Sequence, residues 1–451
     1  MKRNSVSGLS IGAALLLFVS VFPACGQNST AAWKGGCAAV TITPEDPVWV
    51  AGYAFRDHPM EGVRQDIRAK ALALEDASGH KGVVVTIDML SIPKDFSDAL
   101  REEVSRRYGL DRSQVILNVS HTHSGPVIGR ALRYIYPMGP EDWEAVDAYT
   151  RRLYGKLLDL IGASLKDCEP VRISSGGGLA RFATNRRNNV ENALTPLMER
   201  KGPHDYSVPV LKVERPDGTL KAVLFGYACH NTVLSDYFIG GDYAGVAQEQ
   251  LQQLYPGALA LFFQGAGGDQ NPMPRRDVSY AVQFGKELCA AVEQVLSTQM
   301  VPLEATLDTR YSEVMLPLED PPGFEELSEQ GKGKDYQARW ARGMLQEGQQ
   351  GPFISAYPYP IQFWQAGSQK VFALGGELVC DYAAKLKSCY GSDIFVMGYC
   401  NDVMGYIPSP EIWDEGRYEG AVAHKVYALP ARWTRDVQER ILDAVATLVN
   451  Q

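Results

Sequence analysis

The chain lacks several features that would assign it to familiar classes of protein. Its formal net charge of −9 leaves no basic surplus for binding nucleic acid. Its 8 cysteines include no CxxC spacing, which argues against a zinc–thiolate site. No Pro/Ser/Gly-rich linker, charge block, repeat or low-complexity run interrupts the sequence. With 45% hydrophobic and 22% charged residues, the composition is typical of a soluble globular protein with a large core.

The first residues have the pattern of an export signal. A positive start at Met1–Asn4 precedes an apolar run over Leu9–Phe22, which is too short for a comfortable membrane span. We therefore predict a signal peptide over residues 1–24. Because Cys25 follows a small residue, as in bacterial lipoproteins, we expect it to be lipidated and residues 25–35 to form a short tether. The alternative is a simply secreted or periplasmic protein, and in either case the mature protein works outside the cytoplasm.

Strand-like and helix-like segments alternate along the rest of the chain. Lys81–Leu90 is a nearly continuous apolar run of the kind found in buried strands, whereas Glu141–Ser164 carries apolar residues at helical spacing. Val208–Val213 and Leu220–Tyr227 flank a Pro-Asp-Gly turn and predict a hairpin. We therefore predict a single domain of mixed α/β fold over residues 36–451, in which mixed β-sheets have helices packed outside them and the active site lies at the carboxyl ends of strands.

Two later segments have no obvious place in this pattern. Glu319–Glu347 is charged and helix-prone, which predicts a solvated face or a lid. Phe353–Trp364 is rich in aromatic residues, and it either walls a pocket or forms a strand that covers the surface.

The stretch most indicative of function is Asn118–Pro126, in which His121 and His123 follow an apolar strand and precede a Gly-Pro pair. A spacing of two places both imidazoles on one side of the backbone if the backbone stays extended. That geometry suits one metal ligand and one neighbouring acid, base or hydrogen-bond partner. The chain has only 7 histidines, so two within three positions favour chemistry as strongly as the alternative, in which one of them only satisfies buried carbonyl groups.

Other polar side chains also follow apolar strands. His230 ends one such strand, Asp269 and Asn271 follow another through a Gly-rich turn, and two further strands lead to Glu377 and Tyr406. Each could be structural by itself, since Gly-Gly-Asp is a common turn and a glutamate after Gly-Gly can begin a helix. Together they place imidazoles, a carboxylate and a phenol at one edge of the sheets, and such ligands suit Zn²⁺ with one position open for water.

These residues carry a resemblance to the catalytic domain of the neutral (alkaline, non-lysosomal) ceramidase family, and the resemblance covers nearly all of the mature chain. Its most specific parts are the Thr-His-Ser-Gly-Pro string at Thr122–Pro126 and two tyrosines at positions 406 and 418. The resemblance implies a single Zn²⁺ held by His121, His230, Glu377 and Tyr406. It also implies that the amide and its developing oxyanion are bound by residues lining the site, which are His123, Arg186 and Tyr418.

The sequence departs from this family in two places. Ceramidases carry a Gly-Asp-x-Ser-Pro-Asn string whose serine lies next to the metal and is assigned a catalytic role, whereas Asn271 stands at that position in Gly268–Met273. An amide cannot act as an acyl-accepting nucleophile, so the protein has either lost ceramidase activity or uses metal-activated water directly. Ceramidases also continue into an immunoglobulin-like C-terminal domain, whereas this sequence stops at Gln451, which puts the long-chain lipid substrate in question.

We therefore predict an exported zinc-dependent hydrolase that cleaves an amide by metal-activated water. Zn²⁺ lowers the pKa of a bound water toward about 7, His123 or Asp269 can transfer its proton, and Arg186 and Tyr418 can donate hydrogen bonds to an oxyanion. The default substrate is ceramide or a similar N-acyl lipid, and we expect membrane association through the lipid anchor. The alternatives are an amidase or esterase acting on acylated carbohydrate or peptide, and a non-catalytic binding lipoprotein. No feature of the sequence indicates a protein partner.

Overall fold

The computed structural model describes residues 1–2, 32–130, 132–191 and 195–451. The predicted signal peptide beyond its first two residues, the lipidation site at Cys25 and most of the predicted tether lie outside these ranges. Ala32–Gln451 form one unit by their internal contacts. Among the described residues, no helix is long and apolar enough to cross a membrane.

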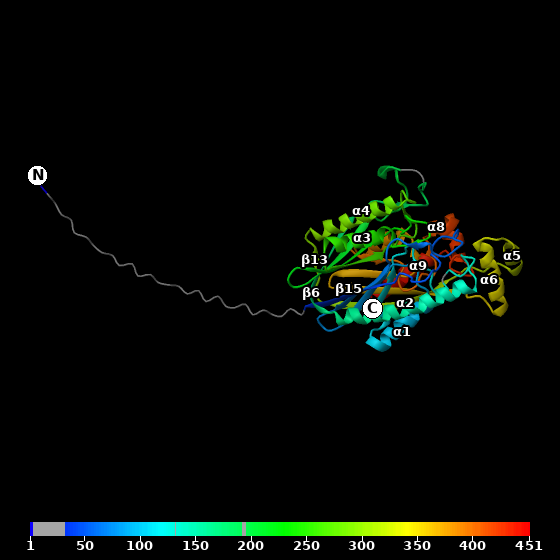
Figure 1. The fold of residues 1–451 in the computed structure, drawn as a ribbon, viewed down its shortest axis with the longest axis horizontal. Coiled ribbons are helices and arrows are strands. Elements are labelled where there is room, and N and C mark those ends of the chain that lie inside the picture. The colour runs from blue at the N-terminus through cyan, green and yellow to red at the C-terminus, as the bar shows by residue number, and fades with distance from the viewer. Residues whose placement is uncertain (3–31, 131, 192–194) are drawn as a thin grey trace. The chain divides into compact units, whose positions relative to one another are not determined.

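A nine-stranded sheet forms the centre of this unit (Figure 1). Its strands are β1 (Trp33–Thr41), β3 (Arg68–Glu75), β4 (Lys81–Ile87), β5 (Val115–Val119), β6 (Glu169–Leu179), β8 (Ser207–Glu214), β9 (Leu220–Tyr227), β11 (Leu259–Gln264) and β13 (Val301–Pro302). Their order is β11-β9-β8-β6-β1-β3-β4-β5, with β13 paired to β6. The pairs β4–β5 and β9–β11 are parallel and the other pairs are antiparallel, so the sheet is mixed.

A smaller sheet packs on one face of the large one. Its strands, in spatial order, are β14 (Leu307–Pro317), β15 (Ala356–Ala366), β16 (Gln369–Leu374) and β18 (Phe395–Met397). Short two-stranded pairs lie near the ends of these sheets: β2 (Gly62–Val63) with β10 (Phe238–Ile239), β7 (Ala183–Asn185) with β12 (Gln270–Pro272), and β17 (Glu377–Leu378) with β19 (Tyr406–Ile407).

Helices cover the outer faces of both sheets. The described helices are α1 (Lys94–Tyr108), α2 (Pro140–Lys166), α3 (Asp242–Leu254), α4 (Val278–Leu296), α5 (Phe324–Gln330), α6 (Tyr336–Gln350), α7 (Cys380–Tyr390), α8 (Pro410–Glu415) and α9 (Val437–Val449). Helices α5 and α6 are the exception, because they pack on each other in a separate hydrophobic cluster at one end of the unit (Figure 1). Helix α1 contacts α2, and α3 packs beside α4, so two helix pairs cover the two halves of the large sheet (Figure 1).

Side-chain alternation along the strands builds the layers. In β3, Ala71 packs among the residues of α1 and α2, whereas its neighbour Leu72 faces the smaller sheet. In β16, Phe372 packs with residues of α7 and α9, whereas Ala373 faces the large sheet. The result is a helix–sheet–sheet–helix arrangement. This confirms the predicted α/β fold of mixed sheets with helices packed outside them.

The large sheet curves until its edge strands β5 and β11 approach each other. Asn118 in β5 joins them, because its Oδ1 accepts from the Gln264 N–H at 2.9 Å and its Nδ2 donates to the Gln264 carbonyl oxygen at 3.3 Å. The same Nδ2 lies 2.7 Å from the carbonyl oxygen of Gly398, just after β18. One fully buried amide therefore ties together three strand ends, and the loops that follow them meet at one place.

The charged segment Glu319–Glu347 and the aromatic-rich segment Phe353–Trp364 are both partly buried. Helix α6 buries Trp340 and Met344 on one face and exposes Arg342 and Gln346 on another, so it is amphipathic, and the solvated face or lid stays a prediction. Most of Phe353–Trp364 lies in β15, which has β14 on one side and β16 on the other. Phe363 and Trp364 are 2% exposed, because this strand is central rather than a cover over the surface.

Candidate metal centre

The chain turns sharply after β5, and this turn aims two histidines inward. His121 has a left-handed backbone with φ of 58°, so the extended backbone on which the same-side expectation depended is not present here. Nδ1 of His121 lies 2.8 Å from the carbonyl oxygen of Leu90, to which its N–H donates. Nε2 of His123 still comes within 3.2 Å of Nε2 of His121. The two buried imidazoles therefore meet through a strained residue, a feature common at functional sites.

His230 reaches the same point from the other half of the large sheet, just after β9. Its backbone N–H donates to the Gln270 carbonyl oxygen at 2.9 Å, and its Nδ1 lies 2.8 Å from the carbonyl oxygen of Gly267. Both His121 and His230 thus have a carbonyl acceptor at Nδ1. The N–H of each ring sits on Nδ1, and the lone pair of Nε2 is free to bind a ligand.

The short parallel pair of β17 and β19 supplies a carboxylate and a phenol, because Glu377 lies opposite Tyr406 in its register. Oε2 of Glu377 lies 3.0 Å from Nε2 of His121 and 3.2 Å from Nε2 of His230. The hydroxyl oxygen of Tyr406 lies 3.2 Å from Nε2 of His230. Four residues from four separate segments, the four expected as metal ligands, therefore come together.

This donor set fits a metal cation. Nε2 of His121, Nε2 of His230 and Oε2 of Glu377 are all acceptors once the Nδ1 protons are assigned, and adjacent acceptors repel unless a cation lies among them. Zn–N and Zn–O bonds are about 2.0–2.2 Å, so tetrahedral ligand atoms lie roughly 3.3 Å apart. The separations of 3.0 and 3.2 Å agree with that geometry.

A second set of ligands overlaps with the first. His121, His123 and His230 form a buried group whose ligand atoms lie within 4.8 Å of one another. The two sets share His121 and His230 and differ in whether His123 or Glu377 completes them. Glu377 approaches both shared imidazoles within 3.2 Å, whereas His123 hydrogen-bonds only to His121 of that pair, so the distances favour the set with Glu377.

Burial governs the charge states at the site. Burial, assisted by the nearby Arg186 guanidinium, lowers the pKa of His230 to about 4. Burial and the neighbouring His121 and His230 hold the pKa of His123 well below its usual range. Both His123 and His230 are therefore neutral near pH 7. The neutral form is the one in which an imidazole binds a metal or accepts a proton.

Arg186 connects the predicted ligands to the cavity above them. Its Nη2 donates to the Tyr406 hydroxyl oxygen at 3.1 Å, its Nη1 lies 3.4 Å from Oδ1 of Asn271, and its Nε donates to Glu419 at 2.7 Å. Its backbone N–H donates to the Asp269 carbonyl oxygen at 2.9 Å. A guanidinium held on both sides in this way can stabilise negative charge that develops beside Tyr406.

Asp269 lies behind the site rather than in the cavity. Its Oδ1 accepts from the Cys380 N–H at 2.8 Å, and its Oδ2 accepts from the Asn185 side chain at 2.9 Å. It is fully buried, and burial raises the pKa of its carboxyl group. These contacts hold the segment that carries Arg186, and Asp269 does not line the cavity.

A cavity of about 500 Å³ opens above the centre. Five of the residues singled out from the sequence line it, namely His123, Arg186, Asn271, Tyr406 and Tyr418. His121, His230 and Glu377 lie deeper and are no more than 1% exposed. The Tyr418 ring packs edge-on against the Tyr406 ring, with 5.4 Å between centroids, and Tyr418 is 39% exposed. The cavity thus offers access from solvent to the converging ligands.

Three further residues contact the site although the sequence indicated no role for them. The Tyr427 hydroxyl donates to Oε1 of Glu377, and the Tyr399 hydroxyl lies 3.4 Å from Oε2 of Glu377. Glu419 binds both Arg186 and Arg187. Tyr399 follows β18 and could have been found by the same strand-end pattern as Glu377. Tyr427 follows no strand, so no local signal marked it.

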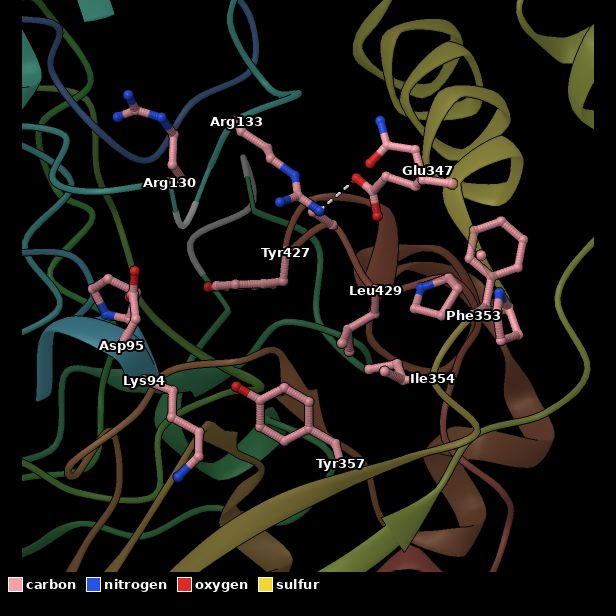
Figure 2. Close-up of a pocket in the computed structure, with 16 residues that line it drawn as sticks. Lys94, Asp95, Arg130, Arg133, Glu347, Phe353, Ile354, Tyr357, Tyr427 and Leu429 are labelled. Atoms are coloured by element: carbon pink, nitrogen blue, oxygen red, sulfur yellow. Dashed lines mark hydrogen bonds and ion pairs between the residues drawn. The ribbon is translucent and has the colours of Figure 1, made fainter. Parts of the chain in front are cut away.

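Tyr427 also lines a second cavity, of about 620 Å³. Figure 2 shows the ring of Tyr427 between Arg133 and Tyr357, with Phe353, Ile354 and Leu429 along one wall. Phe353 is the first residue of the aromatic-rich segment Phe353–Trp364, so the start of that segment does line a pocket. None of the residues predicted for the site lines this cavity.

Comparisons with known proteins link the chain to one protein family. The family model of neutral/alkaline non-lysosomal ceramidase, N-terminal, matches residues 35–291. Neutral ceramidase of Mycobacterium tuberculosis is 22% identical over 82% of this chain and 70% of its own length. Neutral ceramidase of Pseudomonas aeruginosa is 24% identical over 60% of this chain and 41% of its own length.

Solved structures show the same fold. The crystal structure of neutral ceramidase from Pseudomonas aeruginosa has a TM-score of 0.73 at 18% identity and covers 93% of this chain and 74% of that chain. A ceramidase complexed with C2 has a TM-score of 0.69 at 17% identity and covers 90% of this chain and 73% of that chain. The chain belongs to the neutral/alkaline non-lysosomal ceramidase family of hydrolases.

Proposed function

We propose that this chain is an exported, zinc-dependent hydrolase that cleaves the amide bond of a ceramide-like N-acyl substrate. The observation that carries the proposal is the convergence of His121, His230 and Glu377 directly below a solvent-accessible cavity. Family membership supports an acyl amide as substrate, since the curated relatives are neutral ceramidases.

The proposed roles follow from position. Zinc held by His121, His230, Glu377 and Tyr406 would polarise the scissile carbonyl and lower the pKa of a water toward about 7. His123 is neutral and lines the cavity, so it can accept the proton of the attacking water and return it to the leaving amine, a contribution of roughly 10² to 10⁴ in rate.

Other cavity residues bind charge or hold position. Arg186 and Tyr418 can donate to the oxyanion, each a factor of about 10² to 10³ in rate. Asn271 is 3% exposed and accepts weakly from Arg186, which suits an orienting role rather than nucleophilic attack. Asp269 acts at a distance, because its backbone oxygen fixes the Arg186 backbone.

The test combines metal analysis with turnover. The purified chain should contain one zinc per molecule, release fatty acid from short-chain ceramide, and lose activity to a chelator with recovery on adding zinc. His121→Ala should lose most of both zinc and activity, because that residue has the nearest imidazole to Glu377. Full zinc content and activity in His121→Ala would refute the site.

Other outcomes select the alternatives. Turnover of short N-acyl or O-acyl sugars or peptides without turnover of ceramide would identify an amidase or esterase of different specificity. A zinc-loaded sample that hydrolyses no acyl substrate would identify a binding protein with a structural metal.

The location of the protein is part of the proposal. We infer that residues 1–24 are removed on export, that Cys25 is lipidated, and that the residues between Cys25 and β1 tether the catalytic domain to a membrane surface. This tether is shorter than the range 25–35 expected from the sequence, because Trp33, Lys34 and Gly35 belong to β1 and pair with β6. Mass spectrometry of the N-terminal peptide from the natural source tests this inference. A mature terminus at Cys25 carrying diacylglycerol supports it, and an unmodified terminus would show a secreted or periplasmic protein instead.

A further inference from the structure

The mouth of the cavity above the metal centre is strongly basic, although the chain has a net charge of −9. Two glutamates, Glu191 and Glu419, line it. Five arginines line the same cavity, namely Arg186, Arg187, Arg275, Arg276 and Arg417. The local charge is therefore opposite in sign to that of the whole protein, and such a concentration in a cleft attracts ions of the opposite sign.

The two inner arginines are already compensated. Nε of Arg186 lies 2.7 Å from Glu419, and Arg187 contacts the other oxygen of the same carboxylate. Nη2 of Arg187 also lies 2.6 Å from Glu415. Two guanidinium groups thus share two carboxylates, and Arg187 is only 4% exposed. This inner network fixes the wall of the cavity and leaves no net charge.

The three outer arginines share a single carboxylate. Arg275 binds Glu191 through two nitrogens, and Nε of Arg276 lies 3.5 Å from that same carboxylate. Arg417 donates to the Arg187 carbonyl oxygen at 3.1 Å, and the described part of the chain offers it no carboxylate partner. The residues outside the described ranges include no aspartate or glutamate. The three arginines therefore carry two positive charges more than this carboxylate can balance. Arg417 has no carboxylate partner among the described residues, and Arg276 has only the longer contact with a carboxylate that Arg275 already binds.

The fold holds these two residues in an unfavourable backbone conformation. Arg276 has φ of 83° and Arg417 has φ of 59°, in the left-handed region that is unfavourable for residues other than glycine. Strain of this kind concentrates at ligand-binding sites. The Arg276 guanidinium lies 5.1 Å from the ring centroid of Tyr53, whose ring packs 4.8 Å from that of His123. The Arg276 guanidinium is therefore two contacts away from His123, the proposed proton-transfer group.

The second cavity provides a contrast within the same molecule. Three cations line it, and each has a carboxylate partner: Lys94 with Glu313 at 2.8 Å, Arg130 with Asp147 at 2.6 Å, and Arg133 with Glu347 at 2.7 Å. Figure 2 shows the last of these pairs inside the cavity. Basic residues can therefore line a cavity of this protein and still be balanced by carboxylates. The surplus is particular to the cavity above the metal centre.

We propose that this cavity selects N-acyl amides that carry an anionic group near the amide, with an N-acyl amino acid as the substrate class and Arg276 and Arg417 as the residues that bind its carboxylate. The inference rests on the proposed amide hydrolysis. Guanidinium groups match carboxylates in charge and hydrogen-bond geometry. Hydrolysis would break the amide C–N bond, with the hydroxyl of water going to the acyl carbon and its proton to the departing amino acid.

Matched substrates test this specificity. We would compare the zinc-loaded full chain on N-octanoylglycine, on its sulfonate analogue N-octanoyltaurine, and on the neutral N-octanoylglycinamide. We expect kcat/KM to be at least about tenfold higher for N-octanoylglycine than for N-octanoylglycinamide at low salt, and the ratio to fall as salt screens the charges. If kcat/KM for N-octanoyltaurine also exceeds that for N-octanoylglycinamide, the cavity recognises negative charge in general. If only N-octanoylglycine exceeds the neutral amide, the cavity recognises the carboxylate.

Variants assign the effect to the two arginines. The double variant Arg276→Gln with Arg417→Gln should bring the ratio of kcat/KM for the anionic and neutral amides close to one. The control is Arg440→Gln, which removes an exposed arginine of α9 that is paired with Asp436 and should leave the ratio unchanged. Equal kcat/KM for the charged and neutral amides in the unaltered protein, or a ratio unchanged in the double variant, overturns the proposal.

A binding measurement separates this proposal from the proposed function. If no amide is turned over, hydrolysis fails as the function, but calorimetric titration with the same compounds still reports on the cavity. Tighter binding of N-octanoylglycine than of N-octanoylglycinamide, lost in the double variant, would support the anion site without hydrolysis. Equal affinity would overturn it.

Discussion

The Tyr427 hydroxyl donates a hydrogen bond to Oε1 of Glu377, while Oε2 of the same carboxylate faces His121 at 3.0 Å and His230 at 3.2 Å. One oxygen of the carboxylate is thus fixed from outside the centre, and the other is turned toward the two imidazoles. Partners of this kind orient a metal ligand, and their removal typically weakens metal binding 10- to 100-fold.

Tyr427→Phe should therefore weaken zinc binding by roughly 10- to 100-fold without removing a ligand. Competition titration against a chelating dye measures the dissociation constant. Tyr154→Phe is the control, since this tyrosine of α2 donates from its hydroxyl to the Ala99 carbonyl oxygen of α1 at an exposed position. Equal zinc affinity in the Tyr427 variant and the unaltered protein would show that the carboxylate needs no such support.

The two overlapping ligand sets make opposite predictions for Glu377 and His123. We expect Glu377→Ala to lose bound zinc, whereas His123→Ala keeps about one zinc per molecule and loses roughly 10² to 10⁴ in kcat/KM. Elemental analysis and turnover on the same samples measure both, and circular dichroism checks that each variant is folded. Zinc lost from His123→Ala but retained by Glu377→Ala would instead identify the three-histidine group as the site.

Asn271 tests whether a serine is the missing element of ceramide hydrolysis. Its side chain lies at the cavity wall and is a weak acceptor for Arg186 at 3.4 Å, so it can change without disturbing the proposed ligands. We expect Asn271→Ser to leave zinc content unchanged and to raise the rate of ceramide hydrolysis. Asn271→Ala is the control, because it removes the amide without adding a hydroxyl. Equal rates of ceramide hydrolysis in the two variants would show that the smaller side chain, and not the serine hydroxyl, causes the increase.

Asp402 makes stability depend on pH. Its carboxyl is 2% exposed, accepts from the Tyr357 hydroxyl at 2.8 Å, and has a pKa raised by burial to about 7. Between about pH 4 and 7 the folded state binds more protons at this group than the unfolded state, so its contribution to the free energy of unfolding falls as pH rises.

Asp402→Asn should therefore gain stability relative to the unaltered protein as pH rises from 5 to 8, by up to a few kcal/mol. Urea unfolding of metal-free samples at both pH values measures the difference and avoids the pH dependence of metal binding. Parallel pH dependence in the two proteins would mean that the buried carboxyl does not titrate in this range.

Much of the fold followed from local patterns. A nearly continuous apolar run predicted β4, a Pro-Asp-Gly turn between two apolar segments predicted the hairpin of β8 and β9, and helical spacing predicted α2. The buried face of helix α6 was not predicted. Its charged residues indicated a solvated face, but Trp340 is fully buried and donates from its indole N–H to the Leu429 carbonyl oxygen, a partner that is distant in sequence.

The sequence by itself determined the chemical types available and where each enters the structure. His121, His230, Glu377 and Tyr406 each follow an apolar strand, and polar groups at strand ends are placed at the edge of a sheet. Asn271 was also visible in sequence, since the difference from a serine is a matter of residue identity alone.

Only the tertiary structure decided which of these residues meet. β5 and β11 lie at opposite ends of the strand order, and it is the curvature of the sheet, closed by Asn118 and Gln264, that brings their loops together. Pairing between distant residues likewise put Asp269 behind the site, Tyr427 against Glu377, and surplus positive charge at Arg276 and Arg417. Such contacts depend on distances across the fold, and no local pattern of residues encodes them.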